Sequence, residues 1–224
     1  MGFNTAAFSV AIMGDFSVAR PPAVAVRALE RLLAWRLDVA HVNPAGWNEM
    51  TSAGGDTTRY AGGVVVRLHD ISGHRDTGIT ACPGQYLYSL LPQIRTAVAA
   101  MGLPKFYKPS LPLASIVSGV PENMRIRANG SARLTWSVTV LDPSGDVFVT
   151  LPTQTGRALD LLWPGGGTPA QPTEPGIYEI LIAASASGAV ARSALLPFTV
   201  RPAPSPSPSP SPTISPSPTV TPTP

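Results

Sequence analysis

Residues 71–84 read ISGHRDTGITACPG, and this stretch contains the only cysteine of the chain, Cys82, eight residues after His74. A neutral imidazole and a thiolate are ligands that Zn²⁺ accepts readily. A glycine-flanked histidine followed by a short loop to Cys-Pro-Gly can place both donors at one rim of a sheet. The spacing therefore indicates a two-donor metal site, and a buried, unreactive cysteine near a loop histidine is the alternative.

The whole pattern GHRDxGxTxCPG, followed by QYLYSLLPQIR in residues 85–95, is more specific than its two donors. It resembles the peptidoglycan recognition protein family, whose members are zinc-dependent N-acetylmuramoyl-L-alanine amidases. The N-terminal segments GFNT (residues 2–5) and FSVAIMGDF (residues 8–16) are similar to a strand region of the same family. The resemblance predicts an amidase-like α/β domain over residues 1–102, with a mixed sheet and packed helices.

The resemblance implies roles for several residues. His74 and Cys82 would be zinc ligands, and Thr80 would hydrogen-bond the oxyanion that forms at the scissile carbonyl. A hydroxyl that only stabilises its loop is the alternative for Thr80. Asn4 and Trp47 are the candidate substrate contacts. Stacking on a sugar is the proposed role of Trp47, and packing of its loop onto the core is the alternative.

In the family, a first zinc-binding histidine and an active-site tyrosine lie upstream of the segment that matches GFNT. The domain is therefore expected to be incomplete at its N-terminus, with a signal peptide lost with the missing part. His41 and His69 are poor substitutes for the missing ligand, because a helix end and a strand account for them. Arg75 and Asp76 are expected to fix the motif by hydrogen bonds.

The implied function is zinc-dependent hydrolysis of the amide between N-acetylmuramic acid and L-alanine in peptidoglycan. The protein would then be a secreted or cell-wall-associated bacterial hydrolase with Zn²⁺ as its cofactor and peptidoglycan as its partner. With one zinc ligand missing, the alternative is a non-catalytic protein that binds peptidoglycan or has a structural role in the cell wall.

Composition argues against several other classes of protein. Only 13% of residues are charged and the formal net charge is +3. The sequence pI of about 9.4 has no accompanying stripe of Lys and Arg, which argues against nucleic acid as a partner. No apolar run is long enough to predict a transmembrane segment. A single cysteine excludes an internal disulfide framework.

Hydrophobic periodicity predicts the elements of the first domain. Alternating apolar residues favour a strand at 8–16, and spacings of three and four favour a helix from Pro22 to His41. Residues 43–63 are rich in glycine and predict an irregular loop, followed by a strand at 64–68. A second apolar stripe predicts a helix over 85–101, which Pro92 breaks or restarts.

Residues 103–113 are predicted to be a linker, and residues 114–201 show short alternating strands separated by Gly and Pro, which favour a β-sandwich. The segments WPGGG (163–167), PGIY (175–178) and PFTV (197–200) resemble an immunoglobulin-like module related to flagellar hook-capping proteins. That resemblance implies an accessory spacer or binding module.

A calcium site is conceivable at the three aspartates Asp142, Asp146 and Asp160, but turn chemistry is the simpler explanation for the first two. Residues 202–224 consist of Pro-Ser and Pro-Thr repeats that cannot form a core. They favour extended polyproline II and predict a disordered stalk.

Overall fold

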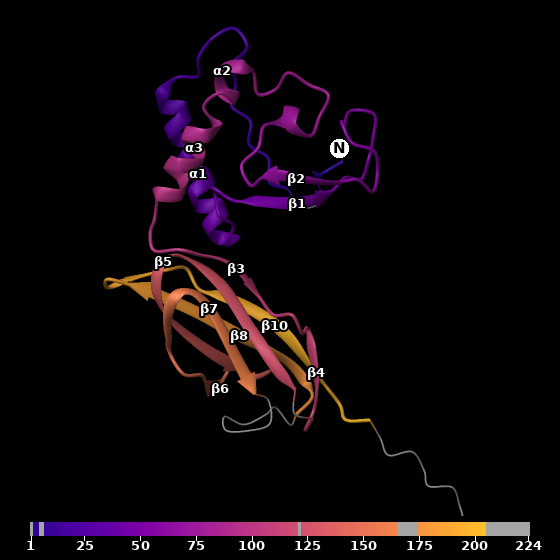
Figure 1. Ribbon diagram of the computed structural model, residues 1–224, viewed down its shortest axis with the longest axis vertical. Coiled ribbons are helices and arrows are strands. Elements are labelled where there is room, and N and C mark those ends of the chain that lie inside the picture. Colours follow the sequence, from indigo (N-terminus) through magenta and orange to yellow (C-terminus); the bar gives the residue numbers. More distant parts are fainter. Residues whose placement is uncertain (1, 5–6, 121, 165–173, 205–224) are drawn as a thin grey trace, which may run out of the picture.

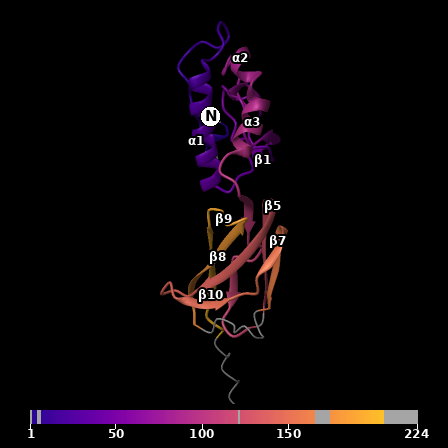
Figure 2. The same cartoon turned by 90° about the vertical axis from the view of Figure 1, so that its left-hand side faces the viewer.

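The computed structural model describes residues 2–4, 7–120, 122–164 and 174–204. The helices and a two-stranded sheet lie at one end of an elongated molecule, here called the helical end (Figure 1). A curled, mixed sheet of eight strands forms the other end, here called the strand end, as the view from the side also shows (Figure 2). From residue 205 onward the predicted stalk lies outside the described residues.

The helical end contains α1 (Ala23–Val39), α2 (Gln85–Tyr88) and α3 (Leu91–Ala100). The helix predicted over residues 22–41 is confirmed. So is the break in the second helix, because Pro92 lies in the first turn of α3, where its missing N–H would have no partner in any case.

The helical end has its own hydrophobic core. Ile94 and Val98 of α3 are fully buried and pack with Ala34 of α1 and with Leu87 and Leu91. These positions are the inward stripes of the two amphipathic helices. None of the helices in the described part of the chain is both long and apolar enough to span a membrane.

The small sheet pairs β1 (Trp47–Thr51) with β2 (Val65–His69) in antiparallel order, with Trp47 opposite His69. The strand predicted at 64–68 is confirmed. The predicted irregular loop 43–63 instead contains β1. Its glycines flank β1 and do not interrupt it, so the run WNEMT remains free to pair.

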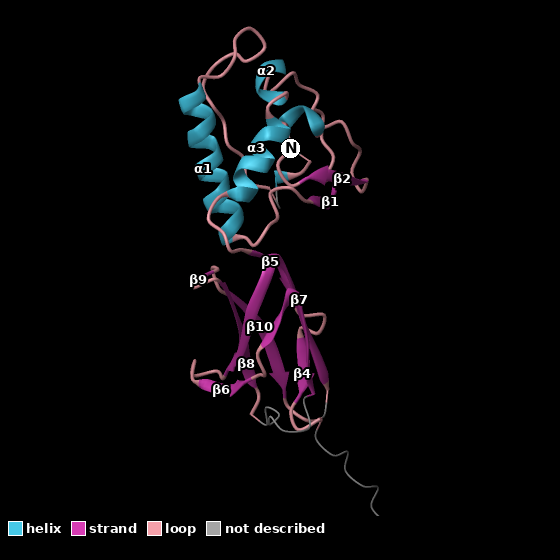
Figure 3. Ribbon diagram, turned by 60° about the vertical axis from the view of Figure 1, so that its left-hand side comes forward, coloured by secondary structure: helices cyan, strands magenta, loops and turns pink. Residues whose placement is uncertain are grey.

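The predicted strand at residues 8–16 is wrong, because the described residues of this segment have no strand assignment. Phe8 is 50% exposed and Val10 is 36% exposed, whereas a central strand would bury both. A strand requires a neighbour to accept and donate its backbone hydrogen bonds, and β1 and β2 pair only with each other among the described residues. Loops therefore account for much of the helical end (Figure 3).

The strand end confirms the predicted strands and lengthens most of them. Its members are β3 (Phe106–Ser110), β4 (Ser115–Val117), β5 (Asn123–Leu141), β6 (Val147–Thr150), β7 (Gln154–Pro164), β8 (Gly176–Ala186), β9 (Ala189–Val190) and β10 (Ala194–Arg201). Strand β10 pairs with β4 in parallel, and the other pairs are antiparallel, so the sheet is mixed.

Strand β5 organises this sheet. It runs for 19 residues and pairs with β3, β6, β7 and β8. Its inward residues alternate as predicted, with Leu134, Trp136, Val138 and Val140 all at most 1% exposed. A register shift between Asn129 and Leu134 lets β5 bend, so one continuous strand joins both sides of the core. The predicted linker contains β3, whose Phe106 is buried in this same core.

Candidate functional site

Residues 71–84, here called the motif loop, are held together by backbone hydrogen bonds. The Arg75 N–H donates to the Cys82 carbonyl oxygen at 2.9 Å, which joins the beginning and end of the histidine-to-cysteine segment. Across its middle, Gly78 forms an isolated antiparallel bridge with Thr58. Apart from a 3₁₀ turn at residues 74–76, the motif loop is therefore fixed by hydrogen bonds that lie outside the helices and sheets.

Asp76 anchors the motif loop from within, as the sequence predicts. One carboxylate oxygen accepts from the Gly73 N–H at 2.8 Å, and the other accepts from the Tyr88 hydroxyl at 2.6 Å. The Arg75 guanidinium donates to the Ala81 carbonyl and lies over the Tyr88 ring, 4.7 Å from its centroid. These bonds tie the motif loop to the first turn of α2.

His74 and Cys82, the two predicted zinc ligands, are both exposed. His74 begins a short 3₁₀ helix, and its ring lies over Gly78, where an added Cβ would be 2.9 Å from Nε2. Cys82 is a free, exposed thiol, so the alternative of a buried core cysteine does not apply. Both donors face solvent from one hydrogen-bonded loop.

The part of the chain that the structure describes brings no third ligand to His74 and Cys82. Among the described residues, no group of three or more His, Cys, Asp or Glu side chains is arranged to hold a metal ion. The His41 ring nitrogens lie 3.0 and 3.3 Å from two backbone carbonyl oxygens. His69 stacks on Trp47. The described residues thus offer two donors for zinc, and a catalytic zinc normally takes three from the protein.

Thr80 has the loop-stabilising contact that was its alternative role. Its hydroxyl oxygen accepts from the Cys82 N–H at 3.1 Å. A hydroxyl that accepts one hydrogen bond can still donate another. Thr80 therefore orients the backbone of a candidate ligand and retains a hydroxyl hydrogen that it can donate.

Trp47 is 44% exposed, so it does not plug its loop onto the core. Its ring stacks on His69 with 3.4 Å between the centroids, and the Arg67 guanidinium carbon lies 5.3 Å from the ring centroid. These contacts arise because Trp47 is directly opposite His69 in the β1–β2 pair. Two residues of β2, Arg67 and His69, therefore hold the Trp47 ring in place.

A groove of about 600 Å³ lies beside Trp47 and is lined among others by Tyr60, Arg67, His69, Tyr88 and Arg95. It reaches the motif loop at Asp76, and neither His74 nor Cys82 lines it. Burial lowers the pKa of Arg95, whose Nε donates to the Ile71 carbonyl at 2.9 Å. The predicted metal donors and the Trp47 groove are thus separate features of the helical end.

Asn4, the second candidate substrate contact, is exposed. Its segment is placed by the Ala53 N–H, which donates to the Gly2 carbonyl at 2.7 Å, and by Phe3, whose ring meets Tyr60 edge to face at 6.1 Å. Asn4 therefore follows a residue that contacts the groove-lining Tyr60, and Asn4 itself is absent from the groove lining.

Tyr88 is a supporting residue that sequence reasoning did not identify. The hydrogen bond to Asp76, with burial as a smaller cause, raises the pKa of the Tyr88 hydroxyl. Only the neutral phenol of Tyr88 can donate this hydrogen bond. The contribution of the bond to stability is therefore present at neutral pH and is lost as the pH rises above about 10. Position 88 lies six residues beyond Cys82, and no local signal pairs it with Asp76.

Replacing Tyr88 with phenylalanine should lower the free energy of unfolding by about 1–3 kcal/mol, because the Asp76 carboxylate loses a half-buried donor. Urea denaturation at pH 7 measures the change. Tyr86→Phe is the matched control, since Tyr86 is an exposed neighbour on the same short helix. Equal losses in both variants would show that the Asp76 bond contributes nothing specific.

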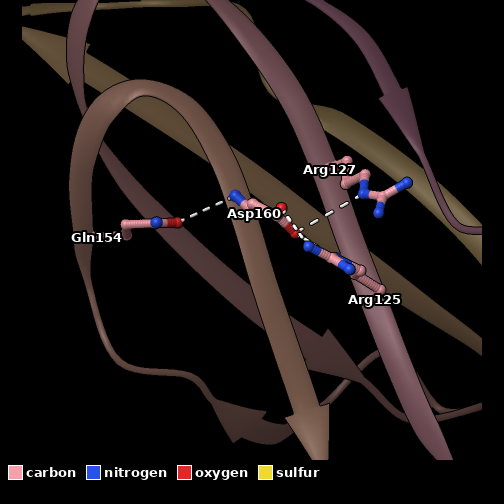
Figure 4. A network of polar contacts seen from close by, with 4 residues as sticks. All are labelled: Arg125, Arg127, Gln154 and Asp160. Atoms are coloured by element: carbon pink, nitrogen blue, oxygen red, sulfur yellow. Dashed lines mark hydrogen bonds and ion pairs between the residues drawn. The ribbon is translucent and has the colours of Figure 1, made fainter.

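The three aspartates proposed for calcium do not converge. The Asp142 carboxylate accepts from the Ser144 and Asp146 N–H groups at 2.8 and 3.0 Å, which is turn chemistry. Asp160 instead forms a network on β5 and β7 with Arg125, Arg127 and Gln154 (Figure 4). The contacts of Asp142 and Asp146 are therefore those of a turn, as the sequence favoured over a calcium site.

Two hydrogen bonds of 2.6 Å from Arg125 lower the pKa of the Asp160 carboxyl. A group with a lowered folded pKa stabilises above its unfolded value and loses that effect as the pH falls. Asp160→Asn should therefore weaken the protein at pH 7 and weaken it less at about pH 3. Thermal unfolding at both pH values measures this, with the exposed loop residue Asp56 changed to Asn as control. If the difference in melting temperature between the wild type and Asp160→Asn is as large at pH 3 as at pH 7, the prediction is contradicted.

No family model matches the chain, and no curated protein matches it. Among solved structures, the dimeric latent PorU from Porphyromonas gingivalis aligns over 46% of this chain and 10% of its own, at 15% identity and a TM-score of 0.34. The alkylpurine DNA glycosylase AlkC from Pseudomonas fluorescens, bound to DNA containing an abasic site analog, aligns over 52% of this chain and 36% of its own, at 18% identity and a TM-score of 0.30. Similarity at this level carries no argument about fold or function.

Proposed function

We propose that the protein belongs to the zinc-dependent N-acetylmuramoyl-L-alanine amidases and acts on peptidoglycan. The supporting observation is the pairing of an exposed imidazole and an exposed thiol, His74 and Cys82, on one loop that hydrogen bonds hold closed. Imidazole and thiolate are the donor types that zinc prefers. The pattern GHRDxGxTxCPG, which resembles that family, supplies the reaction class.

The residues present fit zinc only in part. His74 and Cys82 would hold the ion, and a catalytic zinc supplies a Lewis acid and an activated water. A third donor is needed to fix its geometry, and the described residues do not provide one. No step is therefore assigned to the metal. Thr80 would donate its hydroxyl hydrogen to a substrate oxygen next to Cys82.

The organisation of the rest of the chain is consistent with a function at the cell wall. The helical end would be an amidase-like domain, and the strand end would be an immunoglobulin-like sandwich that serves as an accessory spacer. The Pro-, Ser- and Thr-rich segment from residue 202 would be an extended stalk. This organisation goes with a secreted or cell-wall-associated protein.

A non-catalytic wall protein is the second candidate function. It is favoured by the absence of a third donor among the described residues and by the exposed Trp47 beside a groove. Aromatic rings are common contacts for ligand surfaces because they offer a large apolar face. Such a protein would bind peptidoglycan and release no stem peptide.

The test measures zinc content and the release of stem peptide from purified peptidoglycan over a range of zinc concentrations. We expect weak zinc binding and slow, zinc-dependent release. Cys82→Ser should lower zinc affinity by about tenfold or more, because the hydroxyl is a poorer ligand than a thiolate. Ile79→Ala is the matched control, since Ile79 is exposed on the same loop and offers no donor.

The outcomes separate the two candidates. Release that rises with zinc and is lost in Cys82→Ser supports the amidase. Wall binding without release at any zinc concentration supports the non-catalytic protein. Zinc affinity that is the same in the wild type and in Cys82→Ser would remove the motif loop as a metal site.

A further inference from the structure

The helical end and the strand end meet at a seam that is centred on His41. This residue follows α1, adopts a positive φ of 51° and is 8% exposed. Its ring stacks on Phe106 of β3 with 4.3 Å between the centroids. Its backbone carbonyl accepts from the Lys108 N–H at 2.9 Å. His41 is thus enclosed by residues of both ends.

Both ring nitrogens of His41 face acceptors. Nδ1 lies 3.0 Å from the Phe106 carbonyl oxygen, and Nε2 lies 3.3 Å from the Ser193 carbonyl oxygen. A backbone carbonyl can only accept, and a neutral imidazole carries a single N–H. Only the imidazolium can donate to both carbonyls at once. The neutral ring would leave one nitrogen lone pair facing a carbonyl oxygen.

Several charged and titratable groups lie near His41. They are Asp38 on α1, Asp70 after β2, Lys105, Tyr107 and Lys108 at β3, and Arg192 before β10. Four of them have polar partners of their own, whereas the buried Oδ2 of Asp70 has no hydrogen-bond partner among the described residues. Arg192 pairs with Asp38 at 3.2 Å across the seam. Lys105 Nζ donates to the Ala34 carbonyl at 3.4 Å, and Lys108 Nζ donates to the Trp47 carbonyl at 3.3 Å.

Asp38 and Asp70 favour a charged ring, and the cations of Lys105 and Lys108 oppose it. Burial lowers the pKa of the Lys105 ammonium group and raises the pKa of the Asp70 carboxyl. The Phe106 and Ser193 carbonyls are the polar groups within hydrogen-bond distance of the ring itself.

We propose that His41 is a proton-dependent latch, whose imidazolium fixes the helical end onto the strand end through the carbonyls of Phe106 and Ser193. Closing the seam takes up a proton, so the closed arrangement is favoured at low pH. It weakens as the pH rises, because the neutral ring can donate only one of the two hydrogen bonds. Losing one charge-assisted hydrogen bond should lower the closed-to-open ratio roughly tenfold or more.

The first experiment observes the ring directly. In the full chain with ¹⁵N-labelled histidine, NMR distinguishes a ring with two protonated nitrogens from a neutral tautomer. We expect His41 to carry both protons at pH 5.5, with hydrogen bonds to both carbonyls, and to lose one as the seam opens. A neutral His41 at pH 5.5 would overturn the proposal, and this result needs no variant.

The second experiment measures the distance between the two ends by fluorescence energy transfer. Dyes are attached at Arg27→Cys on α1 and Arg157→Cys on β7, both exposed positions, in a Cys82→Ser background. We expect transfer to fall between pH 5.5 and 8.5. His41→Gln should abolish this response because glutamine does not titrate, and His69→Gln should retain it. Transfer that is constant with pH, or a response that survives in His41→Gln, would contradict the latch.

Discussion

Replacing Gly84 with alanine is expected to lower the free energy of unfolding by about 3 kcal/mol or more, through backbone strain and overpacking together. Gly84 has φ +84° and ψ 154°, a region that is essentially restricted to glycine. An added Cβ would lie 2.3 Å from the Phe16 carbonyl carbon and 2.5 Å from the Ser17 nitrogen. Both are backbone atoms, so no side chain can move aside.

Gly63→Ala is the matched control. Gly63 has φ +85°, and an added Cβ there has no atom within 4 Å. It therefore measures the backbone strain alone, which we expect to be about 1–2 kcal/mol. Urea denaturation of the two variants isolates the contact between Gly84 and residues 16–17. Equal destabilisation would show that this close approach does not exist in solution.

The second large effect is expected at Trp136, where alanine should destabilise the protein by about 3–5 kcal/mol. Trp136 is 0% exposed at the centre of the strand end. Its Nε1 donates to the Gly156 carbonyl at 3.0 Å, and its ring meets Phe106 edge to face at 5.5 Å. The change removes a large apolar side chain and leaves the Gly156 carbonyl without this donor.

Trp35→Ala provides the comparison, because Trp35 is 57% exposed on α1 and should change stability by about 0.5 kcal/mol or less. Trp136→Phe separates packing from the hydrogen bond, since it keeps an aromatic ring and loses the Nε1 donor. Denaturation followed by far-ultraviolet circular dichroism suits all three variants. A loss at Trp136 as small as that at Trp35 would mean that the core of the strand end is not packed as described.

Local patterns predicted those elements whose stability depends on their own residues. The apolar stripe of residues 22–41 and the break at Pro92 gave the helices, and the alternation from Leu134 to Val140 gave part of β5. Residues 8–16 have equally clear alternation and form no strand. Whether an alternating segment becomes a strand depends on a neighbour elsewhere in the chain, and one segment alone carries no information on that neighbour.

The candidate site likewise contains contacts that the sequence predicted and contacts that it did not. The motif itself indicated that Asp76 fixes the loop, because an acidic side chain close to Gly73 can bond a nearby backbone N–H. The contact of Tyr88 with Asp76 and that of Gly84 with residues 16–17 depend on how distant segments pack. The unpredicted strand β3 arose from a segment that contains Pro and Lys, yet Phe106 supplies one of the largest buried side chains.

The position of β10 between two partners has a mechanical consequence. Residues 194–200 pair with β8 in antiparallel order, and residues 199–201 pair with β4 in parallel. A pull on the chain beyond Arg201 acts along the length of β10, so both ladders are sheared and their hydrogen bonds share the tension. Peeling, which breaks such bonds one after another, is the weaker geometry. The hydrogen bonds of both ladders must therefore yield together before a pull on this side extracts β10 from the sheet.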